Sequence, residues 1–492
     1  MAMESEKLYF NGINGRDGEY LADVMDISQA AVWAHGRSSD REHGRELVTR
    51  SRQPAPFPLR PDIDPDALAR AGWAVVFPSV EEGSAEAIRQ REIYQALAPL
   101  REHRRGQAGR IHERRYREYI GEQAYHPGET KQKYLARLGA GPGPADPEKV
   151  PYYLLLVASP EEIPYRIQYQ LDVQYAVGRI HFDTIEDYGY YARSVVAAET
   201  GAPKSPGDVT FFATRNPDDT VSHLIAEYLA TPLASYVKGL DSGWKVHEYI
   251  GDPATKDALS ALLGRQRTPA LLFSAGHGVV FEADDELLLR HQGALVCQDW
   301  TGPRNNNFSR DVYFSGEDIA EDADLSGLIA FHYACYSAGS PRYDDFVYRT
   351  IDRAHRRQVA PRALVAPLAQ RMLSHPRGGA LAVVGHVERV WVSSFLWRHP
   401  EHANKASPQL AVFEAAVRNL LDGHRIGHAM ENFNLRYAEM ASDLTAIIQD
   451  IQLDEAEYDD GEIVQMWLNS NDARNYTVIG DPAVRIGSPG SE

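Results

Sequence analysis

Short apolar runs alternate with helical segments along most of this chain, and this alternation constrains the fold more than any other feature. Strands separated by helices form βαβ units, which build a largely parallel sheet covered by helices. The pattern occurs twice, before and after residue 205. The sequence therefore predicts an α/β protein with mostly parallel sheets flanked by helices and two α/β subdomains in tandem. The expected divisions are an N-terminal extension over 1–65, a first, non-catalytic subdomain over 66–205 and a catalytic subdomain over 206–492.

The composition disfavours several classes of protein. The 492 residues carry a formal net charge of −18, which argues against nucleic acid or an anionic membrane surface as a partner. No apolar run approaches the length of a transmembrane helix, and the first residues lack the basic and apolar regions of a secretory signal. Cys297 and Cys335 are the two cysteines, so neither a disulfide framework nor a cysteine zinc cluster is expected. We therefore expect a cytoplasmic protein without a metal or cofactor.

Two side chains that could take part in catalysis follow apolar runs. His277 follows the run 270–275 and Cys335 follows the run 325–334. The carboxyl ends of parallel strands meet at one edge of a sheet, where open α/β proteins bind their ligands. A cysteine with a histidine about 50 residues upstream is the chain order of the caspase-type peptidases, and here the separation is 58 residues. Each residue alone is explained more simply as a buried strand-end side chain, but together they indicate a Cys–His dyad.

Five segments in the same order resemble the gingipain-type cysteine peptidases, the clan CD relatives of caspases and separase. LLFSAGHG and LIAFHYACYSAG resemble the two catalytic segments, and GGALAVVGHVERVW resembles the strand and loop after the nucleophile. The stretch from YYLLLVAS to YYARSVVAAE resembles the first subdomain, with its Ile-Pro turn and Val-Gly-Arg strand, and YTVIGDPAVRI resembles the closing strand. The similarity covers about residues 70–486. It implies the caspase-like (caspase-hemoglobinase) fold and a cysteine endopeptidase that needs no cofactor.

The resemblance implies roles for the catalytic residues. Cys335 is the nucleophile, His277 the general acid–base, and the N–H groups of Gly278 and Cys335 hold the oxyanion. Cys297, which lies inside the apolar run GALVCQDW, is expected to be structural. The family also carries an acidic residue near its histidine, but the aligned position here is Arg215. The group that orients the imidazole is thus left open between a backbone carbonyl and the nearby acids Glu282, Asp284 and Asp285.

The resemblance also implies a pocket for the substrate side chain before the scissile bond (P1). An aspartate lies at the floor of that pocket in the gingipains, and the matching position is Asp218, with Asp219 one residue away. A carboxylate there selects Arg, and Lys less well, because a guanidinium pairs through two hydrogen bonds. Trp391 is implied to cover the pocket. The alternative for either aspartate is a helix N-cap.

The stretch 101–119 carries seven arginines against three glutamates, a basic island in an acidic chain. Gly106 and Gly109 interrupt the helical pattern there, which predicts a flexible, exposed loop. A peptidase that prefers arginine could then process itself after Arg105 or Arg110. The alternative is a solvated basic helix face.

The predicted function is that of a cysteine endopeptidase cleaving after a basic residue. Its expected partners are a protein or peptide substrate and an upstream activator protein or protease, within a bacterial stress or antiviral defence pathway. One alternative is a catalytically silent caspase-like interaction module. Another is a serine esterase, which would need a G-x-S-x-G elbow that the sequence lacks.

Overall fold

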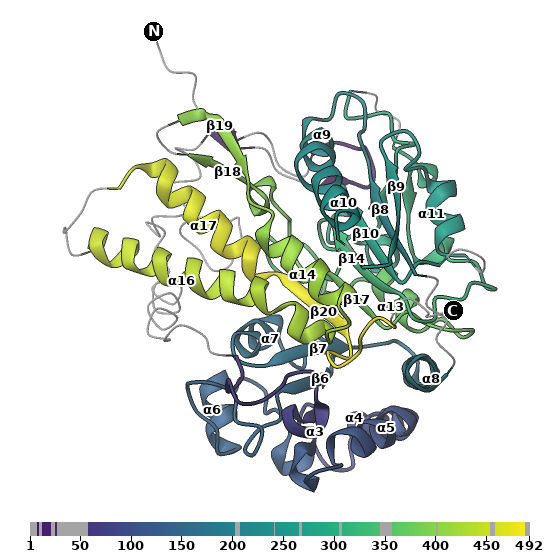
Figure 1. Ribbon diagram of the computed structural model, residues 1–492, viewed down its shortest axis with the longest axis vertical. Helices are drawn as coiled ribbons and strands as arrows, with labels where there is room; N and C mark the ends of the chain where they lie inside the picture. The colour runs from purple at the N-terminus through teal and green to yellow at the C-terminus, as the bar shows by residue number, and fades with distance from the viewer. Residues whose placement is uncertain are drawn as a thin grey trace.

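A ten-stranded sheet forms the centre of the molecule (Figure 1). The computed structural model describes residues 7–8, 12–20, 25–26, 58–201, 207–240, 242–264, 268–304, 308–344, 357–399, 402–452 and 458–487. The spatial order of the strands is β5 (Tyr116–Tyr119), β4 (Trp73–Val76), β6 (Tyr153–Val157), β7 (Ala176–Ile180), β20 (Tyr476–Gly480), β17 (Ala382–His386), β14 (Ile329–Tyr333), β10 (Leu271–Ala275), β8 (Asp208–Ala213) and β9 (Lys245–Ile250).

The sheet is parallel except where β20 runs antiparallel to β17, so the predicted α/β class with a mostly parallel sheet is confirmed. The central strands are apolar and fully buried, as strands covered by helices on both faces require. β20 comes from the end of the chain and pairs with β7 of the first half and β17 of the second, so one sheet runs through both halves. The predicted change at residue 205 falls between α8 and β8, and the division into two subdomains stays a prediction.

Glycine allows the strand from the end of the chain to approach β7. A Cβ at Gly178 would lie 2.2 Å from the carbonyl oxygen of Gly480. No side chain fits at that distance, so the glycine of the Val-Gly-Arg segment is needed for the contact that joins the two halves.

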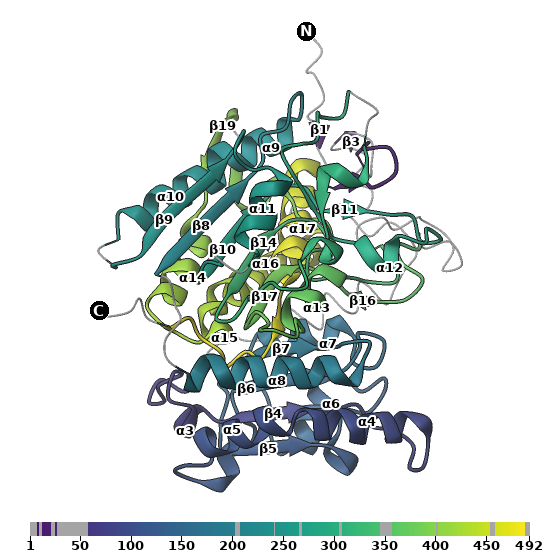
Figure 2. The same ribbon diagram turned by 90° about the vertical axis from the view of Figure 1, so that its right-hand side faces the viewer.

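The first half carries its helices at the bottom of the molecule (Figure 2). Both α4 and α5 pack against α8. The helices and short turns of this half are α3 (Leu68–Ala71), α4 (Ala85–Ala96), α5 (Ala98–Ala108), η1 (Glu113–Arg115), η2 (Gly121–Gln123), α6 (Lys131–Arg137), α7 (Tyr165–Asp172) and α8 (Ile185–Thr200).

The second half holds a longer set of helices, of which α16 and α17 pack against each other and α14 packs on α16. The sequence DDFVYRTIDRAH (344–355) favours a helix, but the part after Asp344 lies outside the described residues. The helical elements here are α9 (Thr220–Ile225), η3 (Ala226–Ala230), α10 (Thr231–Lys238), α11 (Lys256–Leu262), α12 (Leu288–His291), η4 (Arg310–Val312), η5 (Gly316–Asp318), α13 (Pro367–Leu373), η7 (Val392–Ser394), α14 (Ala411–Leu421), α15 (Ile426–Ala429), α16 (Glu431–Gln452) and α17 (Asp460–Arg474).

Short strand pairs lie outside the main sheet, and one of them joins the beginning of the chain to the catalytic half through β2 and β11. These strands are β1 (Lys7–Leu8), β2 (Ile13–Asn14), β3 (Met25–Asp26), β11 (Val279–Val280), β12 (Leu295–Val296), β13 (Tyr313–Phe314), β15 (Gly339–Ser340), β16 (Leu364–Val365), β18 (Leu396–His399) and β19 (His402–Pro408). Within the described part of the chain, no helix is both long enough and apolar enough to cross a membrane.

The part of the basic island up to Ala108 folds as helix α5, so the flexible loop predicted around Gly106 is wrong. Gly106 lies inside α5, and the N–H of Gly109 donates to the carbonyl of Arg105 at 2.9 Å. The Arg104 side chain is fully buried and pairs with Asp481 at 2.7 Å and Glu199 at 2.7 Å. Ion pairs with distant residues thus stabilise a segment for which two glycines and a run of charges had predicted a loop.

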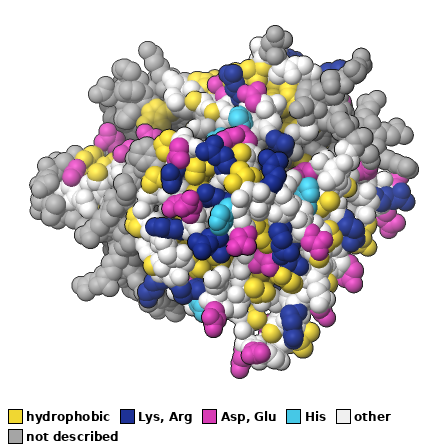
Figure 3. All heavy atoms as spheres, turned by 60° about the horizontal axis from the view of Figure 1, so that its bottom comes forward, with side chains coloured by type: hydrophobic (Ala, Val, Ile, Leu, Met, Phe, Trp, Pro, Cys, Tyr) yellow, Lys and Arg dark blue, Asp and Glu magenta, His cyan; other side chains and the backbone are white. Residues whose placement is uncertain are grey.

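The outer face of the first half is also not a continuous basic patch. In Figure 3, Lys and Arg side chains on this face are interspersed with Asp and Glu side chains. Arg105, whose side chain is 55% exposed, illustrates the mixture, since it pairs with Glu118 at 3.0 Å. Of the two alternatives, the helix face describes residues 101–108, although Arg104 on that helix points into the core and not into solvent.

Candidate active site

The register of two neighbouring strands brings the predicted dyad to one edge of the sheet. β10 and β14 run parallel with Ala275 opposite Tyr333. His277 and Cys335 each follow two residues later, so both lie beyond the carboxyl ends of adjacent strands. The backbones meet closely, because a Cβ at Gly278 would lie 1.9 Å from the carbonyl oxygen of Cys335. Glycine after the histidine is therefore required for the close approach of the two catalytic turns.

His277 is oriented by Asp219. The imidazole Nε2 lies 2.7 Å from Asp219 Oδ2, and both side chains are fully buried. Asp219 is the N-cap of α9 and accepts the N–H of Ser222 at 3.1 Å. Its second oxygen accepts the hydroxyl of Tyr20 at 2.6 Å. Burial opposes the charge of this carboxyl, but the imidazole and the hydrogen bonds from His277, Tyr20 and Ser222 hold the pKa of Asp219 well below its usual range.

The partner of Nε2 determines which nitrogen of His277 is basic. A carboxylate accepts hydrogen bonds, so the Nε2 that faces Asp219 carries a proton and Nδ1 presents the lone pair. Nδ1 faces the N–H of Gly12 at 3.4 Å. The ring is bordered at its edges by Trp300, with centroids 5.8 Å apart, and by Tyr20 at 6.1 Å. Nδ1 is therefore the nitrogen left to accept a proton, and it is the position that Gly12 faces here.

The orientation of His277 corrects the sequence-based expectations. The suggested orienting acids near the histidine do not face it: Asp285 pairs with Arg16, and Glu282 lies 3.4 Å from Arg357. Asp219, expected one position from the pocket floor, is instead the N-cap of α9 and the histidine partner. Its place at the start of the helix after β8, the strand beside β10, is a signal that could have identified it.

Asp218 differs from its neighbour Asp219 in exposure, in partner and in backbone conformation. Its side chain is 47% exposed and lies 3.2 Å from the guanidinium of Arg304. Its backbone has a φ of 56°, an uncommon conformation for a residue other than glycine, which turns its side chain away from the direction of Asp219. The structure therefore does not bury Asp218 at the floor of a pocket. Its role in recognising a basic side chain stays a prediction.

The Cys335 thiol is buried among backbone donors. Its Sγ accepts the N–H of Val390 at 3.4 Å, and the thiol is fully covered. Burial raises the pKa of Cys335 to about 12, although the N–H groups of Val390 and Gly278 act in the opposite direction. The next residue, Tyr336, has a φ of 56°, so the nucleophile turn carries backbone strain of the kind found at functional sites.

Cys297 has no such setting. Its side chain is fully buried, its Sγ faces the carbonyl of Leu295 at 3.6 Å, and burial raises its pKa strongly. It follows β12 and does not lie at the edge of the main sheet, which agrees with the structural role expected from its apolar run.

Trp391 and His386 are held by the C-terminal helices. The N–H of Trp391 donates to Asp472 Oδ1 at 2.9 Å, and its side chain is 3% exposed. His386 is buried with its ring nitrogens 2.7 Å from the carbonyl of Glu388 and 3.1 Å from that of Asp472. His386 is the last residue of β17, and the backbone carbonyls around its ring give it a structural environment. The role of Trp391 as a pocket cover stays a prediction.

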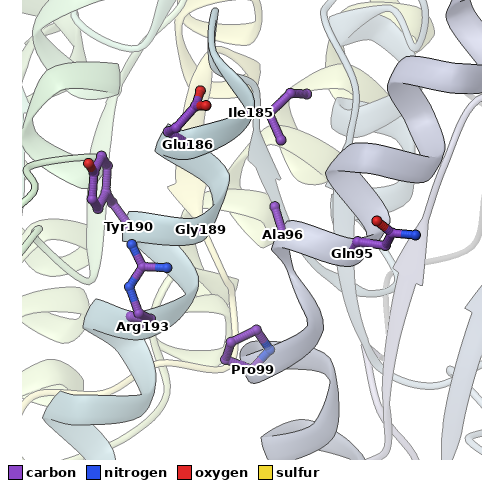
Figure 4. A pocket seen from close by; sticks show the side chains of 8 residues that line it. All are labelled: Gln95, Ala96, Pro99, Ile185, Glu186, Gly189, Tyr190 and Arg193. Carbon is purple, nitrogen blue, oxygen red and sulfur yellow. The ribbon is translucent and has the colours of Figure 1, made fainter.

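Two cavities were compared as candidate binding sites. The one beside the nucleophile turn, lined by Tyr336, Asp344 and Arg389 among others, has a volume of about 10 Å³, space for about one water molecule. A larger groove of about 350 Å³ lies between α8 and the helices α4 and α5 (Figure 4). That groove carries Glu186, Tyr190 and Arg193 but neither member of the dyad. Among the described residues, no cluster of three or more His, Cys, Asp and Glu side chains could hold a metal ion.

A caspase-like fold with a cysteine and a histidine beyond adjacent strand ends defines the class of the caspase-like cysteine peptidases. The model of peptidase family C25 matches residues 85–487, and the chain belongs to this family. The gingipain resemblance predicted from the sequence is confirmed by this family match, and the predicted α/β fold by the sheet. The segment before residue 85 lies outside the match.

Solved structures show the same likeness at low identity. The Arg-specific cysteine proteinase gingipain R matches at 12% identity and a TM-score of 0.45, over 87% of this chain and 80% of that one. The complex of the Porphyromonas gingivalis RgpB pro- and mature domains matches at 13% identity and a TM-score of 0.45, over 85% and 80%. The Saccharomyces cerevisiae separase–securin complex matches at 10% identity and a TM-score of 0.32, over 67% and 15%. Comparison with curated protein sequences gives no match.

Proposed function

We propose that this cysteine peptidase is an endopeptidase that works through Cys335 and His277, with Asp219 as the group that positions the imidazole. The observation that carries the proposal is the shared offset of both residues beyond adjacent parallel strands. The hydrogen bond from His277 to Asp219 supplies the third element of a triad, in which a carboxylate holds the histidine and stabilises the imidazolium.

The proposed reaction follows from the nitrogen that Asp219 leaves basic. Nδ1 of His277 takes the proton of the Cys335 thiol, and the thiolate attacks the scissile carbonyl carbon. The N–H groups of Gly278 and Cys335 stabilise the oxyanion, a role in which one donor typically contributes about 3–4 kcal/mol. His277 then gives its proton to the leaving amine as the C–N bond breaks, and the thioester remains. A water molecule, deprotonated by Nδ1, hydrolyses the thioester and restores the thiol.

We further propose that the P1 side chain is basic and that Asp218 recognises it. Asp218 lies beside the positioning residue Asp219, and its carboxylate already binds a guanidinium, that of Arg304. A substrate arginine could replace Arg304, and its planar fork matches a carboxylate better than a lysine ammonium does. A P1 side chain that covers Asp218 also removes the water that weakens the present surface pair.

A panel of fluorogenic peptides that differ in the P1 residue tests both proposals. Wild-type protein should cleave Arg peptides best, Lys peptides less well and acidic or apolar peptides poorly. Asp218→Ala should reduce kcat/KM for Arg peptides much more than for Leu peptides, whereas Asp219→Asn should reduce kcat for all of them. A preference for an acidic or apolar P1 residue would refute the role of Asp218 while leaving the dyad intact.

A catalytically silent module is the second reading, and one observation favours it for the state described here. Cys335 and His277 are both fully buried, and the thiol has a pKa near 12. A serine esterase has no such support, because the Ser337 hydroxyl donates to the carbonyl of Ala334 at 2.7 Å. Peptide hydrolysis that disappears in Cys335→Ala excludes the silent module.

Three finer expectations stay predictions. Self-cleavage after Arg105 or Arg110 now requires local unfolding at the end of α5, since proteases bind an extended chain. The two free cysteines agree with a reducing, cytoplasmic setting. An upstream activator in a stress or defence pathway would need a latent enzyme to act on.

A further inference from the structure

Residues 12–20, the N-terminal strap, lie directly on the catalytic histidine segment. β2 of the strap pairs with β11, which begins two residues after His277. The N–H of Ile13 donates to the carbonyl of Gly278 at 3.3 Å, and that of Gly15 donates to Val280 at 2.7 Å. An extended segment has thus been added to the strand edge that leaves the active site, which is the way many proteins bind a peptide.

Side chains of the strap anchor this strand on both sides of the histidine. Ile13 is fully buried in a small apolar cluster with Val279, Phe281 and Trp300. Arg16 forms an ion pair with Asp285. The apolar anchor holds the strap beside the wall of the histidine site, and the ion pair fixes its register along β11.

The two ends of the strap face the two functional sides of the His277–Asp219 pair. At one end, the N–H of Gly12 faces Nδ1 at 3.4 Å, the nitrogen that must accept the thiol proton. At the other end, the hydroxyl of Tyr20 donates to Asp219 at 2.6 Å. Because Asp219 faces Nε2 and Gly12 faces Nδ1, both nitrogens of the imidazole have partners other than the Cys335 thiol.

We propose that the N-terminal strap is an autoinhibitory strand, and that the peptidase becomes active when residues 12–20 leave β11 and the catalytic histidine. This inference rests on the proposed Cys335–His277 function and adds its regulation. The strap lies outside the residues matched by the family model, which begin at 85. Because the strap belongs to the same chain, its high effective concentration holds the site closed with few contacts.

The buried thiol agrees with a closed resting state. Gly278 accepts the strap through its carbonyl and faces Cys335 through its N–H, so strap and nucleophile touch the same residue from opposite sides. Withdrawal of the strap exposes the edge of Gly278 and β11 to solvent or substrate. It also returns Nδ1 of His277 to the thiol, which favours the thiolate.

The test measures the rate at which iodoacetamide labels Cys335, located by mass spectrometry, alongside peptide hydrolysis. The variants are a deletion of residues 1–20, Ile13→Asp, Tyr20→Phe and the control Glu19→Ala, whose exposed side chain leaves the strap contacts in place. Deletion and Ile13→Asp should raise the labelling rate and kcat/KM at least tenfold. Tyr20→Phe should raise them severalfold, and Glu19→Ala should leave them unchanged. A synthetic peptide of residues 9–20 should inhibit the deletion variant and slow its labelling.

Other outcomes separate the two proposals. An unchanged or slower labelling rate in folded Ile13→Asp protein, checked by thermal unfolding, overturns the inhibitory strap. Loss of hydrolysis with unchanged labelling also overturns it, because the strap would then be a part of the active site. Faster labelling without hydrolysis of any peptide supports the strap and instead refutes the proposed peptidase function. If the deletion variant does not fold, Ile13→Asp and protection of Cys335 by the added peptide decide the question.

Discussion

Both halves of the molecule bury charged side chains, but the partners that pair with these side chains come from different parts of the chain. In the first half, Arg104 is fully buried between Asp481 and Glu199, and Arg179 donates to Gln168 and to two backbone carbonyls. In the catalytic half, His277 and Asp219 form the buried pair, and the strap supplies further partners to both.

The buried arginines of the first half join elements of the fold. Arg179 of the Val-Gly-Arg segment donates to the carbonyl of Ile163 at 2.6 Å, and so binds the Ile-Pro turn to its strand. Arg104 ties α5 to Asp481 of the closing strand. These partners lie within the matched family region. The catalytic pair differs, because two of its contacts come from Gly12 and Tyr20, which lie outside that region.

The largest expected effect is that of Cys335→Ala, which should abolish peptide hydrolysis because the acyl-enzyme is proposed to form on its sulfur. Cys297→Ala should keep activity, since its thiol lies off the catalytic edge. Initial rates on the best Arg peptide measure both. Hydrolysis by Cys335→Ala, or its loss in folded Cys297→Ala, would show that the wrong cysteine has been assigned.

Asp219→Asn should reduce kcat by roughly 10²–10⁴-fold, because an amide can favour the wrong imidazole tautomer. The change is nearly isosteric, so it tests positioning and not packing. Asp218→Asn serves as the matched control and should leave kcat on Leu peptides within a fewfold. Equal effects of the two substitutions would contradict the role given to Asp219.

Arg104→Met should lower the free energy of unfolding by about 3–5 kcal/mol, because it leaves Asp481 and Glu199 without their buried partner. The activity of the remaining folded protein should be unchanged, since α5 does not touch the dyad. The control Arg105→Met removes a side chain that is 55% exposed and should cost less than about 1 kcal/mol. Urea unfolding followed by circular dichroism measures both. A lower kcat in Arg104→Met without loss of stability would contradict the purely structural role given to Arg104.

Acid should destabilise both buried pairs, in the same direction. Burial opposes ionisation of Glu199, but Arg104, His103 and Gln107 hold the pKa of this carboxyl well below its usual range, as the partners of Asp219 do for that residue. A carboxyl whose pKa is lowered by folding contributes stability above the unfolded value of about 4, and this contribution is lost as pH falls toward the folded value. Each group adds a slope of up to about 1.4 kcal/mol per pH unit below pH 4. Glu199→Gln should flatten the acid limb of stability, and an unchanged slope would contradict the shift.

The smallest stability effect should come from Asp218→Ala. Its ion pair with Arg304 joins two exposed side chains, and such pairs contribute less than about 1 kcal/mol. Thermal unfolding should show almost no change, while the preference for Arg over Leu peptides falls. A large loss of stability would mean that Asp218 supports the loop before Asp219 and does not act chiefly on the substrate.

Much of the fold could be predicted because it is encoded locally. The alternation of apolar runs with helical segments identifies β10 and β14. Their parallel pairing then places His277 and Cys335 at one edge of the sheet. The role of Asp219 was missed because the apolar pattern places strand ends but does not specify which side chain of the loop after β8 turns toward the imidazole. The same limit explains the error at the basic island, since Arg104 meets Asp481 across 377 residues. Composition near Arg104 indicated a loop, and a distant carboxylate made it a buried helix position.

By itself, the sequence determined the α/β class, the strand ends that carry His277 and Cys335, and the membership of the chain among gingipain-type peptidases. These features depend on short periodic patterns and on residue types that few other arrangements require. Only the tertiary structure decided that Asp219 rather than Asp218 faces the imidazole, and that residues 12–20 occupy Nδ1 and the edge of β11. A side chain's partner depends on which loops meet after the sheet has formed. One step along the backbone, where φ turns positive at Asp218, separates a buried positioning carboxylate from an exposed one.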